Sequence, residues 1–203
     1  MIIFIVPKNE GLKYCKNLVE TLPKAPIQYM WGEDIPFFVE ILIKKDKNAI
    51  GITGEDFLKE YLLNVRDSNL TILQRIPWQE KSALFGKPVL CLLGPKGKTL
   101  EKFPKNLRVA MNKKYAMISK KFLSQLQYRY GITFEKMYFS GSTEEVFVNG
   151  LADLVIDIVF SGKSAIEAGL EVYDKIFESD IVVIGKKETL LNPNKLNNAL
   201  EKR

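Results

Sequence analysis

The chain has 203 residues, of which 46% are hydrophobic, 27% are charged and 11% are aromatic, and its formal net charge is +6. This is the balance of an ordinary globular protein with enough apolar content to bury a core in one domain or in two small ones. It has no histidine and only two cysteines, Cys15 and Cys91. Cys/His metal clusters, disulfide frameworks, a histidine general base and a Ser-His-Asp triad are therefore excluded.

Apolar periodicity predicts strands and helices that alternate along the chain, which is typical of an α/β fold. The stretches 82–94 and 179–185 are expected to pass between two lobes. The predicted strands are Ile2–Val6, Ala49–Ile52, Leu70–Arg75, Ala83–Leu93, Leu107–Ala110, Phe134–Phe139, Val155–Val159 and Ile181–Ile184. The predicted helices are Gly11–Leu22, Ile35–Lys44, Glu55–Leu63, Tyr115–Tyr130, Ser164–Ala168 and Leu196–Lys202.

The hydropathy and charge patterns predict a cytoplasmic protein. The apolar start before Pro7 is too short for a signal peptide, and no run approaches the ~20 apolar residues that span a membrane. The basic residues are scattered, often in pairs such as Lys113-Lys114, without the interleaved aromatics of an RNA-binding signature. We expect neither a membrane nor a nucleic acid as partner, and a diffuse basic excess suits polyanionic substrates.

The strongest functional signal is the apolar strand Val155–Val159, which contains Asp157 and leads into Ser161–Ser164. Small hydroxyl residues, a glycine and a lysine at the start of a helix are suited to binding a phosphate, because free N–H groups and the helix dipole point at the anion. A carboxylate in an apolar strand is costly unless it pairs with a ligand such as sugar hydroxyls or a metal. A Walker A loop is excluded, since Asp157 stands where its first glycine is needed. The pattern favours a phosphoribosyl group, and a plain polar turn is the alternative.

Several short stretches resemble, in collinear order over almost the whole chain, the signature of one enzyme family. They are Ile3–Lys8, Asp34-Ile35-Pro36 with Val39-Glu40, Gly51-Ile52-Thr53-Gly54 with Asp56, Gly141-Ser142-Thr143-Glu144, Gly150-Leu151-Ala152-Asp153, Val155–Val159, Ser161-Gly162 and Gly169-Leu170. The chain is similar in these stretches to ATP phosphoribosyltransferase, the enzyme that opens histidine biosynthesis. The resemblance implies transfer of the phosphoribosyl group of phosphoribosyl pyrophosphate (PRPP) to N1 of ATP, with release of pyrophosphate.

The resemblance also implies a two-lobed periplasmic-binding-protein-like type II fold, with a mixed sheet in each lobe and a double crossover. The first lobe is expected to hold residues 1–90 and 184–203, and the second lobe residues 91–183 with the PRPP loop. Substrates are expected between the lobes, at the carboxyl ends of the strands.

The family motif assigns roles to three groups of residues. Asp157 and Glu144 are expected to be catalytic and to face the ribose, although a capping or structural role is the alternative for both. Mg2+ is expected to arrive with the phosphate substrate and to have no direct protein ligand. The PRPP loop is expected to be Ser161, Gly162, Lys163, Ser164 and Ala165, and the nucleotide side of the cleft is expected to include Lys8, Asp34, Gly51, Thr53, Gly54 and Asp56.

The chain departs from the family pattern where arginines are usual, and this leaves other functions open. Lysines are expected to replace part of the lost charge. The alternatives are a non-catalytic two-lobed protein that binds a small anion, a diverged subunit that depends on a partner, and a purine- or orotate-type phosphoribosyltransferase. The last usually has two adjacent acidic residues, whereas Asp157 is followed by Ile158. The departures lie at Asn9-Glu10-Gly11, Glu33, Val89–Leu92 and Ser161–Ala165, and the substituting lysines are Lys8, Lys113, Lys114 and Lys163.

The length of the chain resembles that of short family members, which lack a histidine-sensing domain. Only Gly185–Arg203 follow the last predicted crossing. We therefore expect a homodimeric core and a separate regulatory subunit that resembles histidyl-tRNA synthetase.

Overall fold

The computed structural model describes residues 2–8, 19–20 and 25–187. The chain forms two units, residues 1–78 with 180–203 and residues 79–179, so it passes between units twice. Both boundaries lie earlier than the divisions expected after residues 90 and 183. The reason is that β5 (Val89–Pro95) pairs entirely within the second sheet, and β10 (Ile181–Lys186) entirely within the first.

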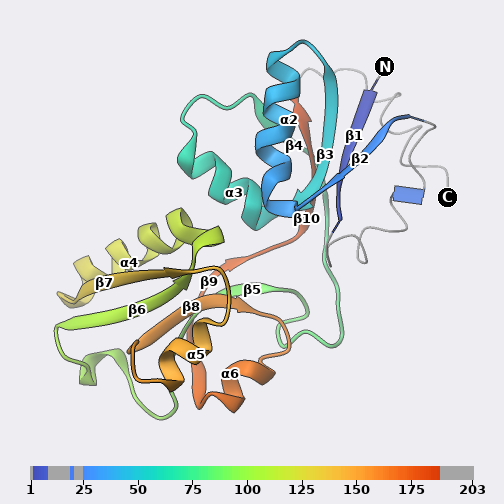
Figure 1. Ribbon diagram of the computed structural model, residues 1–203. Coiled ribbons are helices and arrows are strands. Elements are labelled where there is room, and N and C mark those ends of the chain that lie inside the picture. The colour runs from blue at the N-terminus through green and yellow to red at the C-terminus, as the bar shows by residue number, and fades with distance from the viewer. Residues whose placement is uncertain (1, 9–18, 21–24, 188–203) are drawn as a thin grey trace. The chain divides into compact units, whose positions relative to one another are not determined.

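The first unit is built on a mixed five-stranded sheet with the order β2-β1-β3-β10-β4. β1 is parallel to both of its neighbours, and β10 is antiparallel to β3 and β4. The helices α2 and α3 pack beside β3 and β10 (Figure 1). The bounds are β1 Ile2–Pro7, β2 Ile27–Met30, η1 Gly32–Asp34, α2 Ile35–Lys44, β3 Asn48–Gly54, α3 Glu55–Asn64 and β4 Leu70–Ile76.

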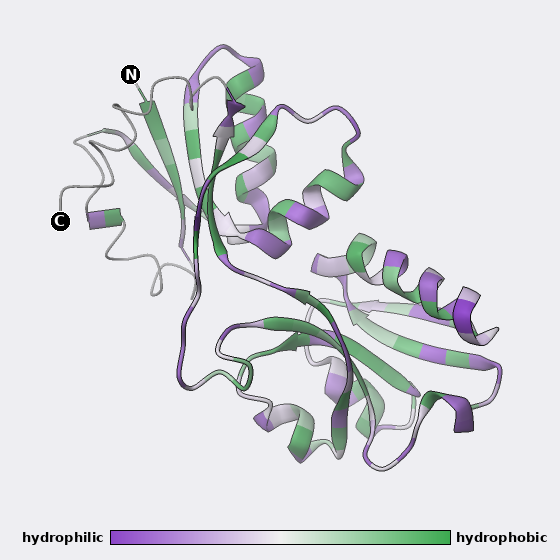
Figure 2. Ribbon diagram, turned by 180° about the vertical axis from the view of Figure 1, so that it is seen from behind, coloured by the Kyte–Doolittle hydropathy of each residue, from purple (hydrophilic) through white to green (hydrophobic). Residues whose placement is uncertain are grey.

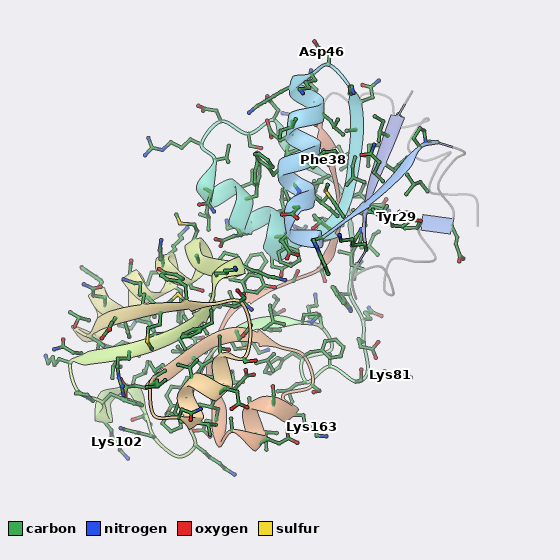
Figure 3. All side chains as sticks on the ribbon, viewed as in Figure 1. Tyr29, Phe38, Asp46, Lys81, Lys102 and Lys163 are labelled. Atoms are coloured by element: carbon green, nitrogen blue, oxygen red, sulfur yellow. The ribbon has the colours of Figure 1, made fainter. Side chains whose placement is uncertain are left out.

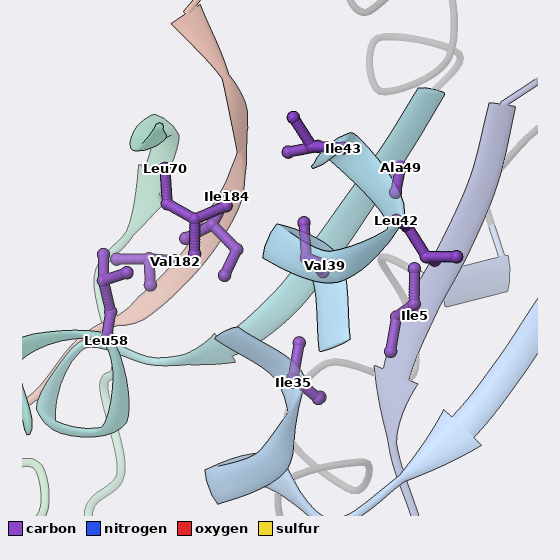
Figure 4. Packing of buried hydrophobic residues seen from close by; sticks show 10 residues of the cluster. All are labelled: Ile5, Ile35, Val39, Leu42, Ile43, Ala49, Leu58, Leu70, Val182 and Ile184. Atoms are coloured by element: carbon purple, nitrogen blue, oxygen red, sulfur yellow. The ribbon is translucent and has the colours of Figure 1, made fainter. Parts of the chain in front are cut away.

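The core of the first unit lies between α2 and one face of this sheet. α2 begins with Pro36 in its first turn, where the missing N–H costs little, and its apolar stripe faces β1, β3 and β10. At Gly51 on β3, an added Cβ would come within 2.7 Å of the Cγ2 atom of Ile35, so glycine permits the close packing of helix on strand. The cluster shown in Figure 4 consists of Ile5, Ile35, Val39, Leu42, Ile43, Ala49, Leu58, Leu70, Val182 and Ile184.

Glu40 is a buried carboxylate on α2 that is only 1% exposed. Its oxygens accept hydrogen bonds from the Ser68 hydroxyl at 2.6 Å and the Asn69 backbone N–H at 3.2 Å, and Lys44 Nζ lies 3.5 Å away. Burial raises the pKa of Glu40, but these contacts outweigh it and hold the pKa below its usual value. Glu40 therefore ties α2 to the segment before β4, which gives this part of the family motif a structural use.

Replacing Glu40 by glutamine is expected to lower the free energy of unfolding by about 2 kcal/mol at neutral pH, because the buried hydrogen bonds lose their charge. The pKa of Glu40 is lower in the folded protein, so its stabilisation is complete above the unfolded value of about 4.3 and is lost as the pH falls through the folded value. Thermal denaturation at neutral pH and at about pH 3 tests this. An equal deficit at both pH values would contradict it.

The second unit repeats this arrangement with the order β7-β6-β8-β5-β9. β6 is parallel to β7 and β8, and β5 is antiparallel to β8 and β9. α4 covers one face of the sheet, and α5 and α6 cover the other (Figure 1). The bounds are β5 Val89–Pro95, η2 Leu100–Lys102, β6 Asn106–Asn112, η3 Lys113–Tyr115, α4 Ala116–Tyr130, β7 Thr133–Phe139, α5 Thr143–Val148, β8 Leu154–Val159, α6 Lys163–Glu167 and β9 Leu170–Glu178.

Strands of both sheets carry long hydrophobic stretches (Figure 2). In the second unit, Val89, Cys91 and Leu93 of β5 are buried against α5 and α6. Burial raises the pKa of the Cys91 thiol to about 12, so Cys91 stays protonated. The expectation that Cys91 acts as a small buried hydrophobe is confirmed, whereas Cys15 lies outside the described residues.

Within the described residues, the predicted elements agree with the structure except at one strand. The stretch Ala83–Leu93 was expected to be extended throughout, but the strand begins only at Val89, and the residues before it form turns. Gly86 has a φ of +74° and Pro88 has no N–H, so neither continues a ladder. The structure adds β2, α5 and β9 to the predicted elements. The helix expected over Gly11–Leu22 falls mostly, and that over Leu196–Lys202 wholly, outside the described residues.

Candidate active site

The carboxyl ends of the parallel strands β6, β7 and β8 lie on one edge of the second sheet. Asn112 ends β6, the segment after Phe139 leads into α5, and β8 runs into Ser161. In parallel sheets this edge is where ligands bind. The structure thus brings Asp157, Glu144 and the loop Ser161–Ala165 together at that edge, as the next contacts show.

Asp157 lies near the end of β8 and accepts hydrogen bonds through both carboxyl oxygens. Oδ1 accepts from the backbone N–H of Ile158 at 2.8 Å and from Asn112 Nδ2 at 3.4 Å, and Oδ2 accepts from the Thr143 hydroxyl at 2.6 Å. Burial raises the pKa of Asp157 above its usual value, and the nearby charge of Glu144 adds to this. The hydrogen bonds oppose the rise without cancelling it.

Glu144 joins this carboxylate to the loop. It lies in the first turn of α5, and its Oε1 atom accepts a hydrogen bond from the Ser164 hydroxyl at 2.9 Å. Its Oε2 atom lies 3.4 Å from the Thr143 hydroxyl, which also contacts Asp157. Hydrogen bonds therefore link Asp157 to Thr143 and Glu144 to Ser164 in the loop, and the Thr143 hydroxyl lies between the two carboxylates.

The loop Ser161–Ala165 turns from β8 into α6 at Gly162, whose φ of +75° is a conformation that favours glycine. Ala165 is buried and anchors the loop, whereas Lys163 and Ser164 are exposed. As the first residues of a helix, Lys163, Ser164 and Ala165 have N–H groups without a carbonyl partner in the preceding turn. The Lys163 side chain lies at the outer end of this loop (Figure 3), 3.8 Å from Glu167.

A turn over residues 80–86 packs against this loop. The backbone N–H of Leu84 donates to the carbonyl of Phe160 at 2.7 Å, and an added Cβ on Gly162 would come within 3.1 Å of Leu84 Cδ2. The sequence offered no signal for this support, because the residues from Ala83 onward were expected to form a strand. Asn112 and Thr143 were also not predicted as contacts of Asp157.

In the first unit, Lys8, Asp34 and Thr53 lie at the carboxyl ends of β1 and β3 or at the start of α2. The Thr53 hydroxyl donates to the carbonyl of Gly32 at 2.8 Å and so links β3 to η1. Lys8 Nζ lies 4.6 Å from the ring centroid of Trp31, in a cation–π contact. These residues form a polar edge on which Lys8 and Asp34 are exposed and Thr53 is buried.

Of the other predicted residues of this unit, two are buried and one is half-buried. Gly51 is buried beneath α2, as described above, and Asp56 is buried in the first turn of α3. Gly54 is the N-cap of α3 with an extended backbone conformation. Gly51 thus has a packing role at the position where sequence reasoning placed a ligand contact.

Among the residues the structure describes, no group of three or more acidic or cysteine side chains is arranged to hold a metal ion. The oxygens of Asp157 and Glu144 already accept protein hydrogen bonds. Within the same described part of the chain, no helix is long and apolar enough to cross a membrane.

Comparison with solved structures defines the class of the protein. The chain aligns over its full length with the alkanesulfonate-binding protein SsuA from Xanthomonas axonopodis pv. citri, with a TM-score of 0.55, 12% identity and 72% of that chain covered. It also aligns over its full length with a chain of the ATP phosphoribosyl transferase (HisG:HisZ) complex from Thermotoga maritima, with a TM-score of 0.74, 20% identity and 95% of that chain covered. The predicted two-lobed periplasmic-binding-protein-like fold is confirmed.

The particular family follows from sequence. A model of the ATP phosphoribosyltransferase family matches residues 32–202, so the chain belongs to this family of transferases, whose reaction is the first step of histidine biosynthesis. A relative named ATP phosphoribosyltransferase from Caldicellulosiruptor saccharolyticus is 28% identical over 86% of this chain and 75% of its own length. Another from Methanothermobacter thermautotrophicus is 29% identical over 82% of this chain, but the match spans only 52% of that relative.

Proposed function

We propose that this chain transfers the phosphoribosyl group of PRPP to N1 of ATP, and that the second unit binds PRPP through Asp157, Glu144 and the loop Ser161–Ala165. The observation that carries the proposal is the pair of hydrogen bonds that link Asp157 to Thr143 and Glu144 to Ser164, with the Thr143 hydroxyl 3.4 Å from Glu144. It places two carboxylates and a loop at the start of a helix on one edge, which suits a sugar with a 5′-phosphate.

The loop supplies the phosphate-binding part of the site. Gly162 lets the backbone approach an anion closely, and the N–H groups that follow it have no carbonyl partner in a preceding helical turn. The N–H of Lys163 donates to the Ser161 hydroxyl at 3.4 Å. The exposed ammonium of Lys163 adds a positive charge beside them. Lysine binds phosphate as a point charge, without the bidentate geometry of the arginines that the family often carries.

The two carboxylates suit the ribose. Oδ1 of Asp157 already accepts from two N–H donors, which keeps that oxygen unprotonated. Among the described residues, Oδ2 accepts from Thr143 alone and retains a lone pair for a sugar hydroxyl. A carboxylate near C1′ also stabilises the positive charge that develops when pyrophosphate leaves. Little covalent chemistry is required of the protein, whose task is to hold the reactants in line.

The polar edge of the first unit, with Lys8, Asp34 and Thr53, is our candidate for binding ATP. Gly54, at the start of α3, adjoins it. When bound with PRPP, Mg2+ would neutralise charge on the departing pyrophosphate. In this proposal, the residues of the loop and of the polar edge bind and orient PRPP and ATP.

We also propose that the chain assembles as a homodimer and depends on a separate regulatory subunit resembling histidyl-tRNA synthetase. The support is the fold similarity to a chain from a complex of two different proteins. The purified chain should then be weakly active and insensitive to histidine. Activity and inhibition by histidine should appear together when the partner from the same source is added. Full activity with histidine inhibition in the chain alone would overturn this dependence.

The test of the reaction is to incubate the protein with ATP, PRPP and Mg2+, to assay pyrophosphate, and to identify phosphoribosyl-ATP by mass spectrometry. The same mixtures without ATP and without PRPP are the controls. Formation of both products only in the complete mixture supports the proposal. Tight binding of PRPP with no turnover, with or without the partner, would favour a protein that binds a small anion without chemistry.

Removing the charge of Lys163 is expected to weaken PRPP binding. Lys163→Ala should raise the KM for PRPP by about tenfold, since one charge-assisted contact to phosphate is lost, and should leave the melting temperature unchanged because the side chain is exposed. Lys102→Ala is the matched control, because Lys102 is an exposed lysine on η2, away from the loop (Figure 3). Steady-state kinetics of both variants check this. Equal KM values would remove Lys163 from the site.

A further inference from the structure

Thr143, the first residue of α5, contacts both carboxylates of the proposed site. Its side chain is fully buried, at 0% exposure, and its hydroxyl oxygen lies 2.6 Å from Asp157 Oδ2 and 3.4 Å from Glu144 Oε2. The preceding Ser142 adopts a left-handed conformation with a φ of +52°, so the chain turns sharply just before Thr143. Thr143 therefore enters the site from a constrained turn.

The hydroxyl has a single proton, and the two distances decide where it goes. A contact of 2.6 Å is typical of a strong hydrogen bond between a hydroxyl and a carboxylate, whereas 3.4 Å is too long for one. The proton is therefore donated to Asp157. The other hydrogen bonds of Asp157, from Ile158 and Asn112, both end on Oδ1, so Thr143 is the only donor to Oδ2 in the described part of the chain.

We propose that Thr143 is a positioning residue for the transfer reaction, whose hydroxyl holds Oδ2 of Asp157 so that the remaining lone pair of this oxygen faces the ribose. The inference rests on the proposed role of Asp157. Without the hydroxyl, the carboxyl group is still attached through Oδ1, but its second oxygen loses its partner. Thr143 does not itself touch the substrate.

The hydrogen bond also bears on the ionisation of Asp157. The groups that face this carboxyl are Glu144 from α5, Asn112 from β6 and, at the paired position of β5, Cys91. Glu144 disfavours ionisation, Asn112 favours it, and the buried Cys91 is a neutral thiol. Donation from Thr143 favours the ionised form, so its loss should raise the pKa of Asp157 further.

The test compares Thr143→Val, which keeps the shape of the side chain and removes the hydroxyl, with Thr143→Ser, which keeps the hydroxyl. The valine variant should lower kcat by about tenfold with little change in the KM for ATP, and should move the acid limb of kcat/KM to higher pH by about one unit. The serine variant should have nearly the kcat and the pH profile of the unaltered protein. A purely structural threonine would change the melting temperature and leave the pH profile in place.

A second measurement is independent of turnover. Protein labelled with 13C at the aspartate carboxyl groups is titrated by NMR, and the spectrum of Asp157→Asn identifies the Asp157 signal. A midpoint that rises in Thr143→Val and returns in Thr143→Ser supports the positioning role, and an unchanged midpoint overturns it. If the unaltered protein makes no phosphoribosyl-ATP, with or without the partner, the proposed function fails, and the titration alone decides whether Thr143 holds Asp157.

Discussion

Replacing Asp157 by asparagine is expected to lower kcat for phosphoribosyl transfer by about 100- to 1000-fold, the usual effect of removing one electrostatic group from an active site. Asparagine keeps an oxygen for the N–H of Ile158 but loses the charge that Asp157 presents to the ribose. Pyrophosphate release at saturating ATP and PRPP measures the change.

The stability of the Asp157→Asn variant, in contrast to its activity, is expected to be retained. Because the pKa of Asp157 is raised in the folded protein, ionisation of this group costs stability as the pH rises from its unfolded value to its folded value. At neutral pH the asparagine variant should therefore melt at the same temperature as the unaltered protein or slightly higher. A lower melting temperature with unchanged specific activity would show that Asp157 is structural.

Asp153→Asn is the matched control, because Asp153 lies just before the same strand at its opposite end. Its carboxylate accepts hydrogen bonds from the backbone N–H of Arg108 at 2.8 Å and from the guanidinium of Arg108 at 3.0 Å. This control should lose stability, by about 1 kcal/mol, and keep its kcat. If both variants lose activity, then any change of charge at β8 lowers kcat. That result would contradict a specific role for Asp157.

Replacing Gly162 by alanine is expected to weaken PRPP binding by at least about tenfold, as for the loss of a hydrogen bond to a charged group. The new Cβ would stand 3.1 Å from Leu84 Cδ2, and alanine disfavours a φ of +75°. Both effects shift the backbone N–H groups that the phosphate would contact. Isothermal titration with PRPP measures the affinity.

Gly169→Ala separates backbone strain from loss of the site. Gly169 also has a φ of +75°, follows the same helix α6 at its other end, and has open space where a Cβ would stand. Both variants should lose about 1 kcal/mol of stability from the left-handed conformation. Only Gly162→Ala should lose affinity. Equal affinities in the two proteins would reject the loop as the phosphate site.

The elements that the sequence predicted well are those whose signals are local. The helix Ile35–Lys44 was predicted with its observed bounds, because a proline at its start, an apolar stripe and a terminal lysine all lie within it. β9 (Leu170–Glu178) was not predicted, since its pairing with β5 contains two register shifts that break the alternation of buried and exposed residues. α5 was also not predicted, because its six residues include threonine and two valines, which are weak helix formers. The helix packs against β6 and β8, and this tertiary contact cannot be read from the local sequence.

The candidate site shows the same division between local and distant signals. Asp157 and the loop after it are neighbours in sequence, so a single stretch of residues predicted their proximity. Glu144 was placed by the family motif, but its hydrogen bond to Ser164 joins residues 20 positions apart. The contacts of Asn112 and Thr143 with Asp157 depend on the order of strands in the sheet and on side-chain conformation, and neither is readable from spacing.

The most direct test of the central claim is an experimental structure of the protein with PRPP and Mg2+ bound. We expect the 5′-phosphate within hydrogen-bond distance of the backbone N–H groups of Gly162, Lys163 and Ser164, and the ribose hydroxyls against Asp157 and Glu144. A PRPP molecule bound elsewhere on the chain, with the loop Ser161–Ala165 making no contact to its phosphate, would contradict the assignment.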